Sequence, residues 1–397
     1  MPNARSIDIE RRVAKVPESA LFILHIGKHK SGSSSIQNFL ALNAEKLKQF
    51  GVLYPEIGRK KYAHHPLVRR IKDDPGGGSA RGDWSDIGAL GRAHPDKRIV
   101  ISSEDLETLK KPHIVELQRQ LGPVQTLIMM YIRDPAGLLP SKYNQLTKSG
   151  INIRDFDRFY EMHAPSLGYE LARRMERRWA EVFGWESLRI RSLDSRSLTG
   201  GDLIEDLLSV IGVRLADLGG SDAPGLARRN VSLGWKPTEV LRALYASVRS
   251  EVGRSTRNPE KIRTDVGSLL RTSCLRILED LKLEGERAQY LTPDQHAECA
   301  AAYSREIMRL NDRIVGPKLP LPDTRSIGQR PFLPAIESIP AGERAEIGHK
   351  LAELLESDAL EDGSATGRRK SKIARRELSM ELRQSLVRAV IRPTANE

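Results

Sequence analysis

The chain has little of several features that would identify common classes of protein. Only two cysteines, Cys274 and Cys299, occur among 397 residues, which argues against a disulfide scaffold or a cysteine-rich zinc site. No apolar run approaches the roughly 20 residues of a membrane span, and residues 1–20 contain no apolar signal segment. These two observations make the cytoplasm the expected compartment. The 397 residues can bury a full hydrophobic core, and 39% hydrophobic with 29% charged residues is typical of a soluble globular protein.

Acidic residues are also scarce relative to basic ones. The chain has 52 Asp and Glu against 64 Lys and Arg, a formal net charge of +12. Such an excess favours anionic partners. Aromatic residues make up only 5% and are not interleaved with the basic ones, so we do not expect nucleic acid as the partner. An anionic small molecule, or the surface of a glycan or lipid, explains the charge equally well.

The most informative segment is residues 21–35, an apolar run followed by a polar loop. Residues 21–26 (LFILHI) predict a buried strand, and a loop with Gly27 and Gly32 follows. The loop also supplies two lysines and four serines: Lys28, Lys30, Ser31, Ser33, Ser34 and Ser35. Backbone N–H groups and the dipole at the start of the next helix attract anions, and serine hydroxyls donate to phosphate oxygens. The segment therefore predicts a phosphate-binding loop.

The position of the lysine distinguishes this loop from the nucleoside-triphosphate loop. Gly27 and Gly32 have the spacing of G-x-x-x-x-G-K-[ST], but Ser33 occupies the position of the lysine, and Lys30 precedes the second glycine. The order Lys-[ST]-Gly-[ST]-[ST] resembles the 5′-phosphosulfate loop of sulfotransferases that use 3′-phosphoadenosine-5′-phosphosulfate. Two alternatives stay open: a degenerate P-loop nucleotide kinase or hydrolase, and a Ser/Gly-rich turn that only caps a helix.

A second segment points to the same family. Residues 126–132 predict a strand buried on both faces, with Arg133 at its carboxyl end, and Pro135 favours a helix over residues 136–148. Ser141 lies eight residues after Arg133, so the two could hold one phosphate. This spacing resembles the 3′-phosphate motif of the same sulfotransferases. The alternatives are a surface salt bridge for Arg133 and an exposed helical serine at position 141.

Weaker matches extend the resemblance over residues 20–315. Residues 98–102 and 188–191 predict further strands, and residues 201–212 an amphipathic helix that closes on a glycine. Residues 228–232 resemble the late Asn-containing loop of bacterial carbohydrate-type members, which makes Arg228 and Arg229 candidates for the far side of the 3′-phosphate. The late Arg-Lys-Gly loop of cytosolic members is missing, and we interpret residues 76–84 as a flexible loop at the acceptor cleft.

The resemblance implies an α/β, three-layer P-loop-like fold, with a central parallel sheet flanked by helices, plus a helical C-terminal extension. The expected boundaries are an N-terminal arm over 1–19, the sulfotransferase-like domain over 20–315 and the basic extension over 316–397. Residues 340–358 predict a helix, and the basic run at 368–376 leads into another. A solvated helix face is the commoner meaning of such a run, and contact with an anionic membrane surface is the alternative.

The resemblance also implies the reaction, which is transfer of a sulfuryl group to a hydroxyl or amine of a glycan, lipid or small molecule, with no metal. Lys30 occupies the position of the family's catalytic lysine, with Lys28 as the competing residue. Three residues are candidates for the base that accepts the acceptor's proton: His65, Glu104 and Glu56. A non-catalytic anion-binding protein is a further alternative.

Overall fold

A computed structural model describes residues 21–27, 31–73, 83–166, 170–226, 234–255, 289–322, 336–356 and 380–391. The chain divides into two compact units. Unit 1 comprises residues 1–134, 168–229 and 302–322, and unit 2 comprises residues 135–167, 230–301 and 323–397. The units interleave along the sequence. The predicted boundaries at 19/20 and 315/316 stay predictions.

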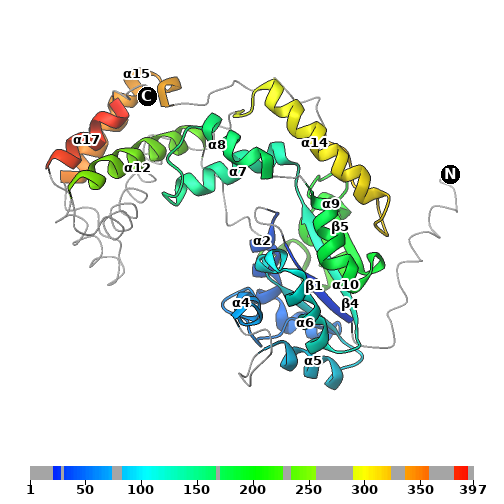
Figure 1. Cartoon of the computed structure of the whole chain (residues 1–397). Coiled ribbons are helices and arrows are strands. Elements are labelled where there is room, and N and C mark those ends of the chain that lie inside the picture. The colour runs from blue at the N-terminus through cyan, green and yellow to red at the C-terminus, as the bar shows by residue number, and fades with distance from the viewer. Residues whose placement is uncertain are drawn as a thin grey trace, which may run out of the picture. The chain divides into compact units, whose positions relative to one another are not determined.

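Unit 1 is built on a five-stranded parallel sheet with the order β2-β3-β1-β4-β5. Figure 1 labels its strands β1, β4 and β5. Its strands are β1 (Leu21–His25), β2 (Val52–Leu53), β3 (Arg98–Ser102), β4 (Gln125–Ile132) and β5 (Leu188–Ser192). The strands expected at 21–26, 98–102, 126–132 and 188–191 are confirmed. Apolar runs form the three central strands because both faces of these strands are covered.

The strand order brings the ends of three strands to one edge. His25 at the end of β1 lies beside Ser102 of β3 on one side and Met129 of β4 on the other. After β1 the chain runs towards β2, and after β4 it runs towards β5 on the opposite side, so the order reverses between β1 and β4. Ligands of open α/β sheets bind at such a point, beyond the carboxyl ends of the strands.

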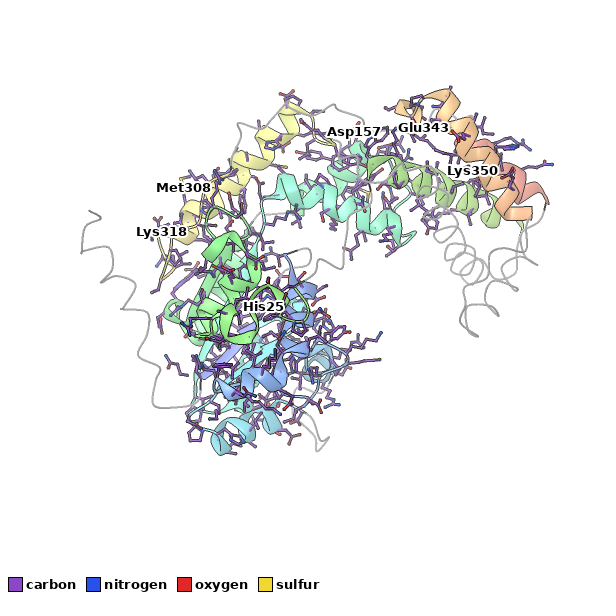
Figure 2. All side chains as sticks on the ribbon, turned by 180° about the vertical axis from the view of Figure 1, so that it is seen from behind. His25, Asp157, Met308, Lys318, Glu343 and Lys350 are labelled. Atoms are coloured by element: carbon purple, nitrogen blue, oxygen red, sulfur yellow. The ribbon has the colours of Figure 1, made fainter. Side chains whose placement is uncertain are left out.

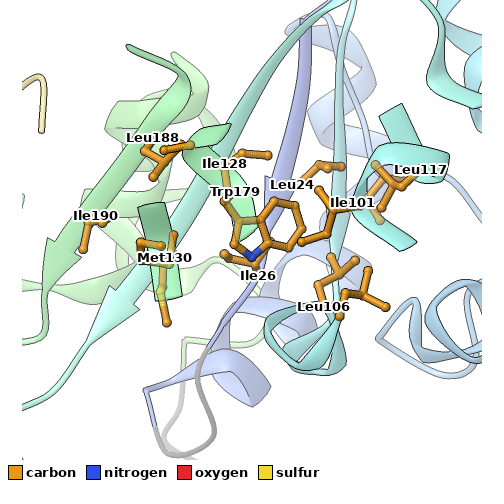
Figure 3. Packing of buried hydrophobic residues seen from close by; sticks show 14 of the residues in the cluster. Leu24, Ile26, Ile101, Leu106, Leu117, Ile128, Met130, Trp179, Leu188 and Ile190 are labelled. Carbon is orange, nitrogen blue, oxygen red and sulfur yellow. The ribbon is translucent and has the colours of Figure 1, made fainter. Parts of the chain in front are cut away.

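Helices flank the sheet and bury one hydrophobic cluster on each face. On one face Trp179 lies among Leu24, Ile101 and Met130 (Figure 3). On the other, Ile23 and Tyr131 pack with residues of α2 and α11. The α-helices of unit 1 are α2 (Ser33–Leu42), α3 (Ala44–Gln49), α4 (His65–Asp73), α5 (Trp84–Ala93), α6 (Lys111–Leu121), α9 (Leu171–Arg174), α10 (Glu181–Phe183) and α11 (Leu203–Ile211). The predicted α/β class with a helix-flanked parallel sheet is confirmed.

Unit 2 is helical in the residues described. Its helices are α7 (Pro135–Lys148), α8 (Phe156–His163), α12 (Trp235–Ser255), α15 (Ala341–Glu356) and α17 (Met380–Ile391), and α14 (Pro293–Asn311) contributes its residues up to 301. A single hydrophobic cluster joins these helices. Lys236 of α12 pairs with Glu343 of α15 at 2.9 Å, and Glu343 is labelled in Figure 2. Ser247 contacts Ser385 of α17 at 2.7 Å.

Several predicted helices are confirmed, and one loop is corrected. The helices expected at 136–148, 201–212 and 340–358 correspond to α7, α11 and α15, and α11 closes on Gly212 with a φ of 71°. The flexible loop predicted over 76–84 is wrong at its end. The Asp83 carboxylate accepts the N–H groups of Ser85 and Asp86, and Trp84 begins α5 as a buried residue. Residues 76–82 lie outside the described part.

Within the described ranges, no helix has the combination of length and apolar composition that crossing a bilayer requires.

Candidate anion-binding and base site

The loop after β1 ends at a helix terminus that suits an anion. Gly32 is the N-cap of α2, with a left-handed φ of 79°, and as a glycine it has no side chain with which to cap the helix. An L side chain would be strained at this φ, and its Cβ would lie 2.3 Å from Leu203 Cδ2. The positive end of α2 therefore faces the loop without a side-chain oxygen of its own.

Gly27 lies beside two buried polar atoms that have no partner. A Cβ at Gly27 would be 2.1 Å from Ser33 Oγ and 3.2 Å from His25 Nε2, so no other residue fits there without a shift. Among the described residues neither Ser33 Oγ nor His25 Nε2 has a hydrogen-bond partner, although both are buried. Buried polar atoms are normally paired, so two together at a helix N-terminus indicate a place for an oxygen-rich ligand.

The other predicted loop residues divide into three groups. Ser31 is buried, whereas Ser34 and Ser35 are exposed on the first turn of α2. Lys28 and Lys30 lie outside the described residues, so their roles stay predictions of the sequence.

Two of the three candidate bases meet at the end of β3. His65 Nδ1 lies 2.8 Å from Ser103 Oγ, and His65 Nε2 lies 3.7 Å from Glu104 Oε2. Gln37 of α2 donates to the same Glu104 oxygen at 2.7 Å, which ties this cluster to the helix that follows the loop. The third candidate, Glu56, is exposed and pairs with Arg59 at 3.1 Å. The structure therefore brings together His65 and Glu104, and not Glu56.

The base cluster contains residues that the sequence did not single out. Asp105 Oδ2 lies 3.3 Å from His65 Nδ1, so two carboxylates flank this histidine. The sequence indicates Asp105 through the run Ser103-Glu104-Asp105, which follows an apolar strand. Our sequence prediction named only Glu104 of this run. His65 does not lie in a loop but is the first residue of α4. Pro66 at the second helical position favours that start.

Two buried histidines support the edge of the sheet. Burial lowers the pKa of His25 and that of His64 to about 4, so both rings are neutral at pH 7. The Ser102 N–H donates to His64 Nδ1 at 3.2 Å, and His64 Nε2 therefore carries the proton and donates to the Pro55 carbonyl at 2.9 Å. His64 is thus a structural residue that fixes the chain just before His65.

The predicted 3′-phosphate residues belong to different units. Arg133 is an exposed residue directly after β4, at the edge of the sheet in unit 1. Ser141 is half-buried on α7 in unit 2. Arg228 and Arg229 lie outside the described residues. Shared binding of one phosphate by Arg133 and Ser141 stays a prediction of their spacing.

The described residues of unit 1 thus present a helix that begins at a glycine N-cap, two polar atoms without a partner, and a histidine flanked by carboxylates at the neighbouring strand end. Groups of these kinds can bind an oxyanion and accept a proton. Comparison of the chain with protein-family models, with curated proteins and with solved structures found no significant match.

Proposed function

We propose that the protein is a sulfotransferase that moves a sulfuryl group from 3′-phosphoadenosine-5′-phosphosulfate to a hydroxyl or amine of a glycan, lipid or small molecule. One observation carries the proposal: Ser33 Oγ and His25 Nε2, which have no partner in the described part of the chain, lie beside Gly27 at the glycine-capped start of α2. A phosphate oxygen can accept the Ser33 O–H and the N–H groups at the start of α2. The same edge of the sheet carries a candidate base.

The order of loop residues favours a phosphosulfate over a nucleoside triphosphate. The lysine that reaches the β- and γ-phosphates would stand at position 33, where the chain has a buried serine. Lys30 stands before Gly32 instead. In this reading the N–H groups and hydroxyls from Ser31 to Ser35 hold the 5′-phosphate, and Lys30 stabilises charge on the bridging oxygen.

Transfer forms a bond from sulfur to the acceptor oxygen or nitrogen and breaks the bond from sulfur to the 5′-phosphate oxygen. The acceptor gives up one proton, and adenosine 3′,5′-bisphosphate leaves. His65 Nε2 is the proton acceptor in this proposal, in which the neutral ring carries its proton on Nδ1, 2.8 Å from Ser103 Oγ and 3.3 Å from Asp105 Oδ2. Glu104, 3.7 Å from Nε2, would stabilise the imidazolium that forms.

In this proposal Arg133 and Ser141 bind the 3′-phosphate, on the basis of their spacing in the sequence. Arg133 supplies a fork of charged donors and Ser141 one hydroxyl, the residue types that bind a terminal phosphate. Arg228 and Arg229 are the reserve candidates. The basic run at 368–376 would favour an anionic acceptor surface or a peripheral membrane contact, and the cytoplasm is the proposed compartment.

A pair of glycine variants tests the proposal. Gly27→Ala puts a methyl group 2.1 Å from Ser33 Oγ, so affinity for adenosine 3′,5′-bisphosphate should fall about tenfold or more, measured by isothermal titration calorimetry. The matched control is Gly342→Ala on α15, where nothing lies within 4 Å and where alanine should keep or raise stability. Equal affinity of wild type and Gly27→Ala, with both folded, would contradict the proposed site.

A further inference from the structure

His25 is a buried histidine to which the reaction above assigns no step. It ends β1, is labelled in Figure 2 and is fully buried. Its ring lies edge-on to that of Tyr131, with 6.1 Å between the centroids. Burial lowers its pKa to about 4, so at pH 7 the ring is neutral and carries one N–H. Such a ring can donate from one nitrogen and accept at the other.

The two nitrogens of His25 have different surroundings. Nδ1 lies 2.7 Å from Ser102 Oγ, on the neighbouring strand β3. Nε2 has no partner among the described residues and lies 3.2 Å from the place where a Cβ of Gly27 would be. Ser33 Oγ, also partnerless, lies 2.1 Å from that place. Ser33 Oγ and His25 Nε2 therefore lie around one point next to Gly27, in the predicted phosphate-binding loop, which we call the oxyanion loop.

We infer that His25 is a positioning residue of the oxyanion loop, which joins Ser102 to Ser33 in a directed chain of hydrogen bonds. In the ligand-bound state the Ser102 O–H donates to His25 Nδ1, His25 Nε2–H donates to Ser33 Oγ, and the Ser33 O–H donates to the oxyanion. The assignment of that oxyanion as a 5′-phosphosulfate rests on the proposed function. The chain itself requires only a phosphate-like anion.

The direction of the chain follows from the charge of the ligand. A serine has one proton to donate, and its lone pairs can then accept the N–H of His25. With every donor pointing towards the anion, each bond polarises the next and strengthens it. The reverse direction would turn the Ser33 proton towards Nε2 and leave only lone pairs facing the negative ligand. Gly27 is required because a side chain there would occupy the point of contact.

The tautomer of His25 is the direct test, with inorganic pyrophosphate as the probe and ¹⁵N-histidine-labelled full-length protein. In nitrogen–proton correlation spectra with pyrophosphate, His25 should carry its proton on Nε2, and the Nε2 signal should move as the anion binds. In Ser33→Ala that movement should be lost. A proton on Nδ1 in the pyrophosphate-bound protein would overturn the inference, as would a wild type that does not bind pyrophosphate.

A double-mutant cycle provides a second readout. His25→Leu and Ser33→Ala should each weaken pyrophosphate binding about fivefold to tenfold, and the double variant should be no worse than the worse single one. His25→Gln, whose amide N–H can reach the place of Nε2, should recover part of the loss. Additive losses in folded variants would overturn the chain. If pyrophosphate shows the coupling but adenosine 3′,5′-bisphosphate does not bind, the proposed function fails and the chain stands.

Discussion

The two predicted phosphate-binding groups differ in how the chain builds them. The 5′ group consists of the residues predicted to bind the 5′-phosphate, from Lys28 to Ser35. It is continuous in sequence, lies within unit 1 and has described neighbours on β1, β3 and α2. The residues predicted for the 3′ group, Arg133 and Ser141, belong to unit 1 and unit 2 respectively. A group built inside one unit is preorganised by a single core, whereas residues of two units depend on both. We therefore expect the 5′ group to tolerate less change than the 3′ group.

The largest effect should come from Lys30. Lys30→Ala removes a charge that acts mainly on the bridging oxygen, so turnover should fall about a hundredfold or more. Steady-state sulfuryl transfer measures this effect, and Lys28→Ala is the matched control, with a smaller loss expected. If Lys28→Ala lost more turnover than Lys30→Ala, the two lysines would have to exchange roles.

The base cluster should come next. His65→Ala should lower turnover by about a hundredfold, because a positioned base contributes at least that much. Glu104→Gln should lose less, since it keeps the bond from Gln37 and removes only charge 3.7 Å from Nε2. Glu56→Gln, on an exposed carboxylate outside the cluster, should change turnover little. A larger loss in Glu104→Gln than in His65→Ala would make Glu104 the base.

The 3′ group should affect binding more than turnover at saturation. Arg133→Ala should weaken the binding of adenosine 3′,5′-bisphosphate about tenfold to a hundredfold, and Ser141→Ala about fivefold. The guanidinium can donate several charge-assisted hydrogen bonds to a phosphate, whereas the serine hydroxyl donates one neutral hydrogen bond. Adenosine 5′-phosphosulfate, which lacks the 3′-phosphate, is the control ligand. Wild type should bind it poorly, and Arg133→Ala should no longer distinguish it from the full donor. Retained discrimination would move the 3′-phosphate to Arg228 or Arg229.

The last prediction concerns acid stability and not turnover or binding. The pKa of His25 and that of His64 are lowered to about 4 in the folded state, below the ordinary 6.5, so the unfolded chain takes up protons first as the pH falls. The free energy of unfolding should be steady above about pH 6.5 and fall between 6.5 and 4, by at most about 1.4 kcal/mol per pH unit for each histidine.

Urea denaturation at several pH values measures that slope. His64→Asn should flatten it, whereas His349→Gln, at an exposed position of unit 2, should leave it unchanged. An equal slope in wild type and His64→Asn would contradict the assignment of His64 as a buried neutral ring.

The sequence predicted the sheet well because its strands are short apolar runs that end in polar residues, as at Ser102 and Arg133. It could not predict which side chains meet. His65 and Glu104 are 39 positions apart, and their contact depends on β3 and on the start of α4. The sequence did not predict that Trp84 begins a helix, because the glycines before it suggest a loop. The Asp83 side chain caps the N–H groups of Ser85 and Asp86, which come after Trp84.

The sequence also could not predict how the chain divides into two units. The amphipathic pattern of α7 predicts a buried face and does not say which helix covers it. In the structure, α7 packs with α12 through Tyr143, whose O–H donates to the buried Glu239 at 2.7 Å. The sequence did not mark His25 as a functional residue. It lies within an apolar run, and a buried neutral histidine follows the same strand pattern as its apolar neighbours.

The most direct test of the account compares two ligands on the full-length wild type. Adenosine 3′,5′-bisphosphate should raise the melting temperature in a concentration-dependent way, because a ligand that binds only the folded state stabilises it by mass action. ATP with magnesium should raise it much less, since Ser33 stands where a triphosphate loop has its lysine. Stabilisation by ATP with magnesium and none by the bisphosphate would contradict the sulfotransferase proposal and favour a nucleotide kinase or hydrolase.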